Sequence, residues 1–315
     1  MRLLCATGLS PKCEFAVDRA GRLADQLGME LSLLHVVPPV ESERALEESL
    51  NEAIDYMNLR SRPPMWRWGR SPDVIVGTGS PTRLIAQTVQ RLSPFALVLG
   101  SRRPRGVLDV FEGSTAGKIL QSRGCPVLIV HRSPIAHYRN VLLAMDTSAA
   151  SVRALQTAEM LVGTETETKI VHACEPPYRG MLWHVRHHAR AAETYNNTWR
   201  DEAAIAIRDL LKQHSADFTR YEILVEHAKP AAAILRTVES HRPDLLVLGT
   251  RSAGTVQRAL KGSVTSEVIH KVACDVLIVP APRAAAVKQT HAVPGRTARP
   301  SRRHSPGLPK TGSFG

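Results

Sequence analysis

Short apolar runs and amphipathic stretches alternate along this chain, and one combination of them stands out near its end. The apolar run Leu245–Leu248 is followed by a polar stretch of about a dozen residues. A helical spacing of apolar residues then begins at Val264, and a second apolar run fills Val276–Val279. Apolar runs of four residues are too short for ordinary helices and fit buried strands. The pattern therefore predicts a strand, a glycine-bounded loop, a helix and a second strand.

The same pattern occurs earlier in the chain, over residues 97–130. Gly100, Gly113, Ser114 and Cys125 correspond to Gly249, Gly262, Ser263 and Cys274, each 149 positions later. The start of the chain is also repeated, because residues 4–10 correspond to residues 142–148 and residues 32–36 to residues 169–173. The chain is therefore a tandem duplication of a unit of roughly 140 residues, with a net insertion in the second unit.

Each unit predicts five strands that alternate with helices. The expected strands of the first unit are 3–6, 31–37, 73–76, 97–100 and 127–130, and those of the second are 141–144, 169–173, 221–226, 245–248 and 276–279. Strands separated by helical patterns form a parallel sheet with helices on both faces. We therefore expect an α/β protein with domains at residues 1–134 and 138–280, followed by a basic, disordered tail at residues 281–315.

The net charge of +12 is largely a property of this tail. Residues 281–315 contain seven Lys or Arg residues and no acidic residue, so residues 1–280 carry 34 basic and 29 acidic residues, a net charge of +5. Binding to nucleic acid is therefore an expectation for the tail, and the two domains are only mildly basic.

Composition indicates a cytoplasmic protein. No window of 18 apolar residues predicts a membrane-spanning helix, and the first residues lack the pattern of a signal peptide. The five cysteines are odd in number and show no C-x-x-C spacing, which favours buried thiols in a reducing compartment over a disulfide framework or a zinc site.

Groups that could meet a phosphate gather in the second unit. Gly249 is flexible enough for a bend from strand to loop, and Gly262 and Ser263 open a helix with Thr265 in its first turn. Amide groups at a helix start attract anions. Asp146 follows the first strand of the unit and is expected at the carboxyl edge of the sheet, where it could accept a hydrogen bond from a ribose hydroxyl. The alternative is that these residues only cap a helix and begin a turn.

Two copies of this arrangement resemble tandem universal stress proteins, whose nucleotide-binding members carry an Asp after the first strand and a G-x-x-G, nine residues, G-[S/T] motif after the fourth. The resemblance covers nearly all of residues 1–280 and includes the sequence CPVLIV at residues 125–130. It implies two five-stranded, flavodoxin-like domains of the adenine nucleotide alpha hydrolase-like type. It also implies that their last strands meet, so that the two units form an internal pseudo-dimer.

The motif carries over better to the second unit than to the first. In the second unit the motif's second glycine is Ser252, whereas in the first unit the aspartate is Gly8 and the second glycine is Arg103. The first site is therefore expected to be degenerate. The resemblance implies that the second unit binds ATP, with Mg, or a related adenine nucleotide through Asp146, Ala173, Gly249, Ser252, Gly262, Ser263 and Thr265.

Two other segments carry candidate chemistry. His184 and His188 have the spacing of zinc ligands on a helix, but neighbouring arginines favour a solvated basic face. Residues 65–68 mix two tryptophans with arginine, as single-strand binders do. A surface loop whose tryptophans pack on the paired unit is the favoured interpretation of this segment.

The expected function is regulation of a stress response by nucleotide binding. No general base or nucleophile stands out near the loop, so an enzyme is not expected, beyond slow and incidental ATP hydrolysis. The alternative is a scaffold that binds no nucleotide and acts through protein partners, or through nucleic acid held by the tail. Further homodimerisation of the chain stays open at this point.

Overall fold

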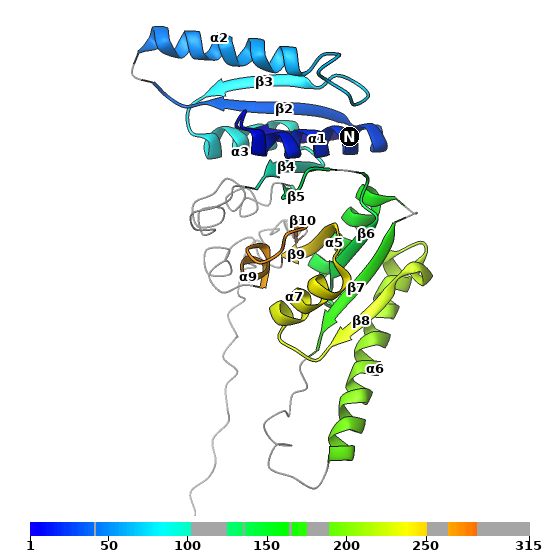
Figure 1. The fold of residues 1–315 in the computed structure, drawn as a ribbon. Coiled ribbons are helices and arrows are strands. Elements are labelled where there is room, and N and C mark those ends of the chain that lie inside the picture. The colour runs from blue at the N-terminus through cyan, green and yellow to red at the C-terminus, as the bar shows by residue number, and fades with distance from the viewer. Residues whose placement is uncertain are drawn as a thin grey trace, which may run out of the picture. The chain divides into compact units, whose positions relative to one another are not determined.

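The computed structural model describes residues 1–40, 42–101, 125–134, 136–163, 166–174, 189–250 and 264–281. The chain is an α/β protein in which strands and helices alternate (Figure 1). Residues 1–283 form one compact unit. The expected tail at residues 281–315 lies outside the described residues from position 282 onwards.

The first half follows the order expected from its apolar runs. Its elements are β1 (Arg2–Thr7), α1 (Pro11–Leu27), β2 (Glu30–Val37), α2 (Glu43–Arg60), β3 (Asp73–Thr78), α3 (Pro81–Leu92), β4 (Ala96–Gly100) and β5 (Val127–Val130). Gly28 ends α1, because its left-handed conformation (φ 61°) is one that glycine adopts without steric cost.

The second half repeats this order with a longer helix in place of α2. Its elements are β6 (Asn140–Ala144), α5 (Ala149–Val162), β7 (Glu167–Ala173), α6 (Ala189–His214), the 3₁₀ turn η3 (Phe218–Arg220), β8 (Glu222–Glu226), α7 (Pro230–His241), β9 (Leu245–Thr250), α9 (Val264–Ile269) and β10 (Asp275–Pro280).

All described strands join in one ten-stranded sheet with the order β3-β2-β1-β4-β5-β10-β9-β6-β7-β8. Strands within each half are parallel, and β5 pairs with β10 in the antiparallel sense. The last strands of the two halves therefore meet, as the sequence predicts. Within each half the spatial order is third, second, first, fourth, fifth. Flavodoxin has the order 2-1-3-4-5, so the flavodoxin likeness applies to the layers and not to the strand order.

Alternate residues of the strands feed two separate cores, one on each face of the sheet. Leu3, Val98 and Val141 belong to the face covered by α1, α2, α5 and α6. Their sequence neighbours Leu4, Leu97 and Leu142 belong to the opposite core, under α3, α7 and α9. This alternation confirms the expected sheet with helices on both faces.

A buried carboxylate lies beside the contact between β5 and β10. Asp275 is 1% exposed and accepts hydrogen bonds from the backbone amide of His131 (2.8 Å) and the hydroxyl of Tyr138 (2.7 Å). Its other partner is Arg19, whose Nε lies 3.3 Å from Asp275 Oδ2 and whose guanidinium lies 4.0 Å from the centroid of the Tyr138 ring. Burial, and then the charge of Asp275, raise the pKa of Tyr138 well above its usual range. The two halves are therefore joined by polar contacts as well as by strand pairing.

None of the helices in the described ranges combines the length and apolar character needed to cross a membrane.

Candidate functional site

The carboxyl edge of the second half brings together the ends of β9, β6 and β7. Ala144 of β6 is level with Leu248 of β9 and with Val171 of β7. Gly249 is the residue after Leu248. Asp146 lies two residues after Ala144, and Ala173 lies two residues after Val171. The chain leaves β6 on one side for β7 and returns on the other as β9, so Asp146 lies at a topological switch point, where open α/β sheets bind ligands.

The carboxylate of Asp146 is held in a fixed position by the start of α5. Its Oδ1 accepts hydrogen bonds from the backbone amide of Ser148 (3.0 Å) and from the hydroxyls of Ser148 (2.5 Å) and Ser151 (2.7 Å). Ser151 also accepts from the amide of Asp146 at 3.0 Å. Asp146 and Ser148 are half-buried and Ser151 is buried. These bonds fix the carboxylate at the helix start, in a turn of the kind that the sequence analysis gave as the alternative.

His172 supports the same segment from the neighbouring strand. Its Nδ1 lies 2.8 Å from the carbonyl oxygen of Met145, the residue before Asp146. A carbonyl can only accept, so Nδ1 is the donor. Our reading of the sequence assigned no role to Ser151 or His172. The signal that could have found the histidine is its repetition, because His35 occupies the equivalent place in the first half.

Gly249 lies inside β9, where the sequence led us to expect a bend from strand to loop. A Cβ atom at this position would lie 2.7 Å from the carbonyl oxygen of Ala150 and 3.1 Å from the amide nitrogen of Ser151. The glycine is therefore needed because β9 passes against the first turn of α5. This contact also brings the strand close to the helix start that holds Asp146.

The remaining predicted residues are only partly placed. Thr265 is buried in α9, at 8% exposure, and Ala173 ends β7 in register with Glu226. Ser252, Gly262 and Ser263 lie outside the described residues. The structure thus brings Asp146, Ala173 and Gly249 to one edge, and the part of the site built from the glycine loop stays a prediction.

The equivalent edge of the first half has a different polar lining. Gly8 takes the place of Asp146, and its amide nitrogen lies 3.3 Å from Cys13 Sγ. The hydroxyl of Ser10 is also 3.3 Å from that sulfur. His35 Nδ1 lies 2.9 Å from the carbonyl oxygen of Thr7, as its counterpart His172 lies near Met145. The first edge keeps the supporting histidine and lacks the acid, while Arg103 lies outside the described residues.

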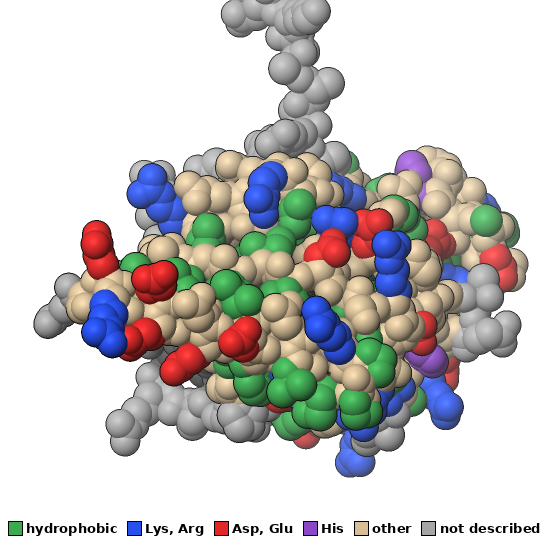
Figure 2. Space-filling view, turned by 90° about the horizontal axis from the view of Figure 1, so that it is seen from above, with side chains coloured by type: hydrophobic (Ala, Val, Ile, Leu, Met, Phe, Trp, Pro, Cys, Tyr) green, Lys and Arg blue, Asp and Glu red, His purple; other side chains and the backbone are tan. Residues whose placement is uncertain are grey.

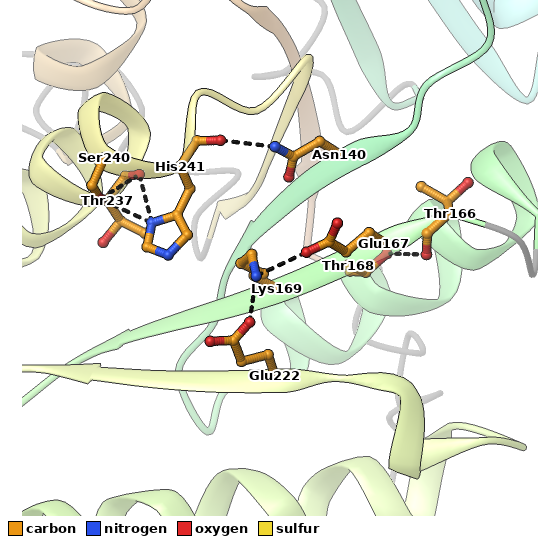
Figure 3. Close-up of polar contacts among 9 residues, drawn as sticks. All are labelled: Asn140, Thr166, Glu167, Thr168, Lys169, Glu222, Thr237, Ser240 and His241. Atoms are coloured by element: carbon orange, nitrogen blue, oxygen red, sulfur yellow. Dashed lines mark hydrogen bonds and ion pairs between the residues drawn. The ribbon is translucent and has the colours of Figure 1, made fainter.

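A second group of polar residues lies near the amino-terminal ends of the strands of the second half (Figure 3). Lys169 of β7 contacts Glu167 (2.9 Å) and Glu222 of β8, and Ser240 Oγ lies 2.9 Å from His241 Nδ1. A Ser–His pair is typical of nucleophilic catalysis. Here, however, Ser240 Oγ is bonded to the carbonyl oxygens of Arg236 (3.0 Å) and Thr237 (3.2 Å) in its own helix. This hydroxyl therefore forms hydrogen bonds within the last turn of α7 and is not an activated nucleophile.

Three buried thiols offer no nucleophile at low pKa either. Burial raises the pKa of Cys125 and of Cys274 to about 12, and raises that of Cys5 further above its usual range. All five cysteines are free. Cys5, Cys125, Cys174 and Cys274 are buried, as the sequence predicts, whereas Cys13 is only partly buried.

The other two candidates from the sequence have different outcomes. His184 and His188 lie outside the described residues, and among the residues that are described no three His, Cys, Asp or Glu side chains gather as a metal site would need. Trp66 is buried in the core under α1, and the ring of Trp68 lies against Gly21 of the same helix. The prediction that the tryptophans pack on the paired unit is therefore wrong, because they pack within their own half.

Comparison with known proteins agrees with the resemblance noted from the sequence. The sequence model of the Universal stress protein family matches residues 1–131 and again residues 137–280. A universal stress protein of Mycolicibacterium smegmatis is 26% identical over 303 residues, which cover 88% of this chain and 96% of that protein. These matches confirm the duplicated family pattern.

Solved structures show the same architecture. The crystal structure of a universal stress protein from Archaeoglobus fulgidus aligns with a TM-score of 0.65 and 21% identity, and covers 90% of this chain and 97% of its own. At that identity the likeness shows the fold. A universal stress protein solved in complex with cAMP covers 47% of this chain and 100% of its own, at 22% identity and a TM-score of 0.34, which is too low to carry an argument.

Proposed function

Because this chain belongs to the universal stress protein family, we propose that it is a regulatory protein that binds ATP or a related adenine nucleotide in its second half. The observation that carries the proposal is the carboxylate of Asp146, held by Ser148 and Ser151 at the topological switch point of the sheet. A carboxylate held in this way accepts hydrogen bonds from ribose hydroxyls without first having to be ordered.

The remaining contacts of the proposed site come from the neighbouring strands and the glycine loop. Ala173 would offer its backbone to the adenine, as the family resemblance implies, and Gly249 keeps β9 close to the start of α5. Ser252, Gly262, Ser263 and Thr265 would meet the phosphates, which carry Mg as their counter-ion. Ser252 stands where the family motif has its second glycine, so the proposal includes a weakened affinity.

We propose a binding protein without a dedicated catalytic step. Of the described groups at this edge that are able to take a proton, Asp146 and His172 are engaged in positioning the chain, and Glu226 and His227 lie at the end of β8. Hydrolysis of bound ATP would therefore be slow and incidental. Reduced thiols and the lack of a membrane-spanning helix in the described ranges fit a cytoplasmic location, which is part of the proposal.

The test is the thermal unfolding of the full chain with and without ATP and Mg. A ligand present at 100 times its dissociation constant stabilises the folded state by roughly 2.7 kcal/mol. We expect an upward shift in Tm that disappears in Asp146→Ala and persists in Asp209→Ala, which removes an exposed carboxylate of α6. No shift for the wild-type chain in millimolar ATP would rule out the nucleotide site. An equal shift in both variants would exclude Asp146 from it.

A second candidate function rests on the tail. Seven basic residues without one acidic residue in positions 281–315 could hold nucleic acid or an acidic partner. The face of the folded part over α2 shows acidic and basic side chains mixed together, so this face has no continuous basic surface for the same purpose (Figure 2). Binding that weakens steeply with salt and is lost on truncation after residue 280 would support this function. Nucleotide binding would survive the same truncation.

A further inference from the structure

A small cleft lies in the first half, at the carboxyl end of α1 and the amino end of β2. Its walls are the last turns of α1, the start of β2 and residues 68–70, and its volume is about 170 Å³. A site for a drug-sized ligand measures roughly 300–1,000 Å³, so this cleft suits a ligand smaller than that. All of its lining residues belong to the described part of the chain.

Two glycines shape the cleft by letting the backbone come close to side chains. A Cβ atom at Gly21 would lie 2.2 Å from Cδ1 of Trp68, so the indole ring rests on the backbone of α1. A Cβ atom at Gly69 would lie 2.3 Å from Oδ1 of Asp25, so that carboxylate rests on the backbone of the tryptophan segment. Trp66 anchors this segment, because its Nε1 donates to the carbonyl oxygen of Arg70 (3.2 Å).

Asp25 is placed where a carboxylate is least favourable. It lies in the last turn of α1, at the negative end of the helix dipole, and this turn contains no basic residue. Among the residues described, no hydrogen bond or ion pair engages its side chain. A helix end of this kind is stabilised by a cation, and the exposed carboxylate of Asp25 lines the cleft.

The other charged groups around the cleft are already engaged. Glu30 is bound by Arg2 (3.0 Å from its Nε), and Arg70 lies 3.9 Å from the other oxygen of the same carboxylate. The guanidinium of Arg22 lies 4.3 Å from the centroid of the Trp68 ring. Asp25 is therefore the carboxylate of this cleft that lacks a counter-ion.

We propose that this cleft binds a small organic cation with a primary ammonium or guanidinium group. Asp25 and the carbonyl end of α1 hold the charge, and the carbon stem of the ligand lies against Trp68 and Met29. A charged hydrogen bond to Asp25 supplies the specificity. The site lies in the half without the nucleotide-binding acid, so the two ligands would occupy different halves of the chain.

The experiment titrates agmatine into the full chain while the indole N–H resonance of Trp68 is followed by NMR. We expect a saturable shift, and a dissociation constant that is about tenfold larger in Asp25→Asn, which corresponds to ~1.4 kcal/mol. The matched control is Asp18→Asn, which removes a carboxylate two turns earlier on α1 that does not line the cleft. A neutral alkylurea of the same length tests whether the charge is required.

Two results would overturn the proposal. One is no saturable shift in the wild-type chain at agmatine concentrations up to ~10 mM. The other is an unchanged dissociation constant in Asp25→Asn, or an equal response to the neutral alkylurea, which would reduce the cleft to an apolar surface.

Discussion

The two halves of this chain end their first strand at equivalent places with different chemistry. Both halves support the segment after this strand through a histidine bonded to a backbone carbonyl, His35 to Thr7 and His172 to Met145. After that the halves differ, because Asp146 and Ser151 in the second half replace Gly8 and Cys13 in the first. The duplication has kept what the fold requires and has changed what a ligand would contact.

The same distinction applies elsewhere in the sheet. Both third helices of the halves end in a left-handed non-glycine residue, Ser93 (φ 44°) and Arg242 (φ 46°). At the contact between halves, by contrast, Asp275 has Pro126 as its equivalent 149 positions earlier. The halves share their backbone geometry, whereas Asp146 and Asp275 of the second half have no acidic counterpart in the first.

The largest expected effect comes from Asp275. Replacing Asp275 by Asn removes the charge that Arg19 faces in a buried site, and should lower the free energy of unfolding by about 3 kcal/mol. Chemical denaturation measures this change. The control Glu267→Gln disturbs an exposed pair with Lys271 and should cost less than ~0.5 kcal/mol. Equal effects would mean that strand pairing alone joins the halves.

The two glycines at the carboxyl edges should respond differently to a methyl group. Gly249→Ala places its Cβ 2.7 Å from the carbonyl oxygen of Ala150 and should cost ~1–3 kcal/mol. Gly8→Ala meets only Cys13 Sγ at 3.6 Å and should stay within ~0.5 kcal/mol of wild type. Urea unfolding of both variants compares the edges directly. If Gly249→Ala were as stable as Gly8→Ala, the close approach of β9 to α5 would not exist in solution.

The hydroxyl of Ser151 should contribute more than the thiol of Cys13. Ser151→Ala removes the hydroxyl that donates to Asp146 Oδ1 and accepts from the Asp146 amide. This change should lower the free energy of unfolding by about 1 kcal/mol. Cys13→Ala removes only weak sulfur contacts and should cost less, as measured in the same denaturation series. The reverse ranking would contradict the assignment of the stronger network to the second half.

The smallest expected effect is a pH dependence of stability, which both halves should show in the same direction. Hydrogen bonds from Arg2 and from Lys169 hold the pKa of Glu30 and of Glu167, respectively, below the ordinary value of 4.5. A depressed folded-state pKa means that the stabilising contribution is present above pH ~4.5 and is lost as pH falls through the folded-state value. The stability difference between wild type and Glu30→Gln, or Glu167→Gln, should therefore shrink between about pH 7 and pH 3. A difference that grows on acidification would reverse the sign of this argument.

Much of the fold could be predicted because its signals are local or repeated. Runs such as Leu245–Leu248 predict the strands. The constant offset of 149 gave the duplication, and the family resemblance implied the pairing of the last strands. Each of these depends on residues that are close together in the sequence or identical in the two copies.

Tertiary contacts were not predictable in the same way. The need for glycine at position 249 comes from Ala150, about a hundred residues away, and no local pattern indicates that contact. Trp66 and Trp68 resemble surface aromatics in sequence, and only the folded chain shows that they pack on α1. The buried role of Asp275 is hidden likewise, because a carboxylate before an apolar strand is ordinarily part of a turn.

The pairing of β5 with β10 has a consequence for how the chain is made. Roughly 145 residues separate the end of β5 at Val130 from the start of β10 at Asp275. At ~5–20 residues per second, a ribosome needs roughly 7–30 s to synthesise them. For that interval the edge of β5, whose residues are all buried in the finished protein, has no partner strand from its own chain. A chain that stalls in this interval exposes an edge that the β5 of another copy can pair with, whereas a completed chain closes it with its own last strand.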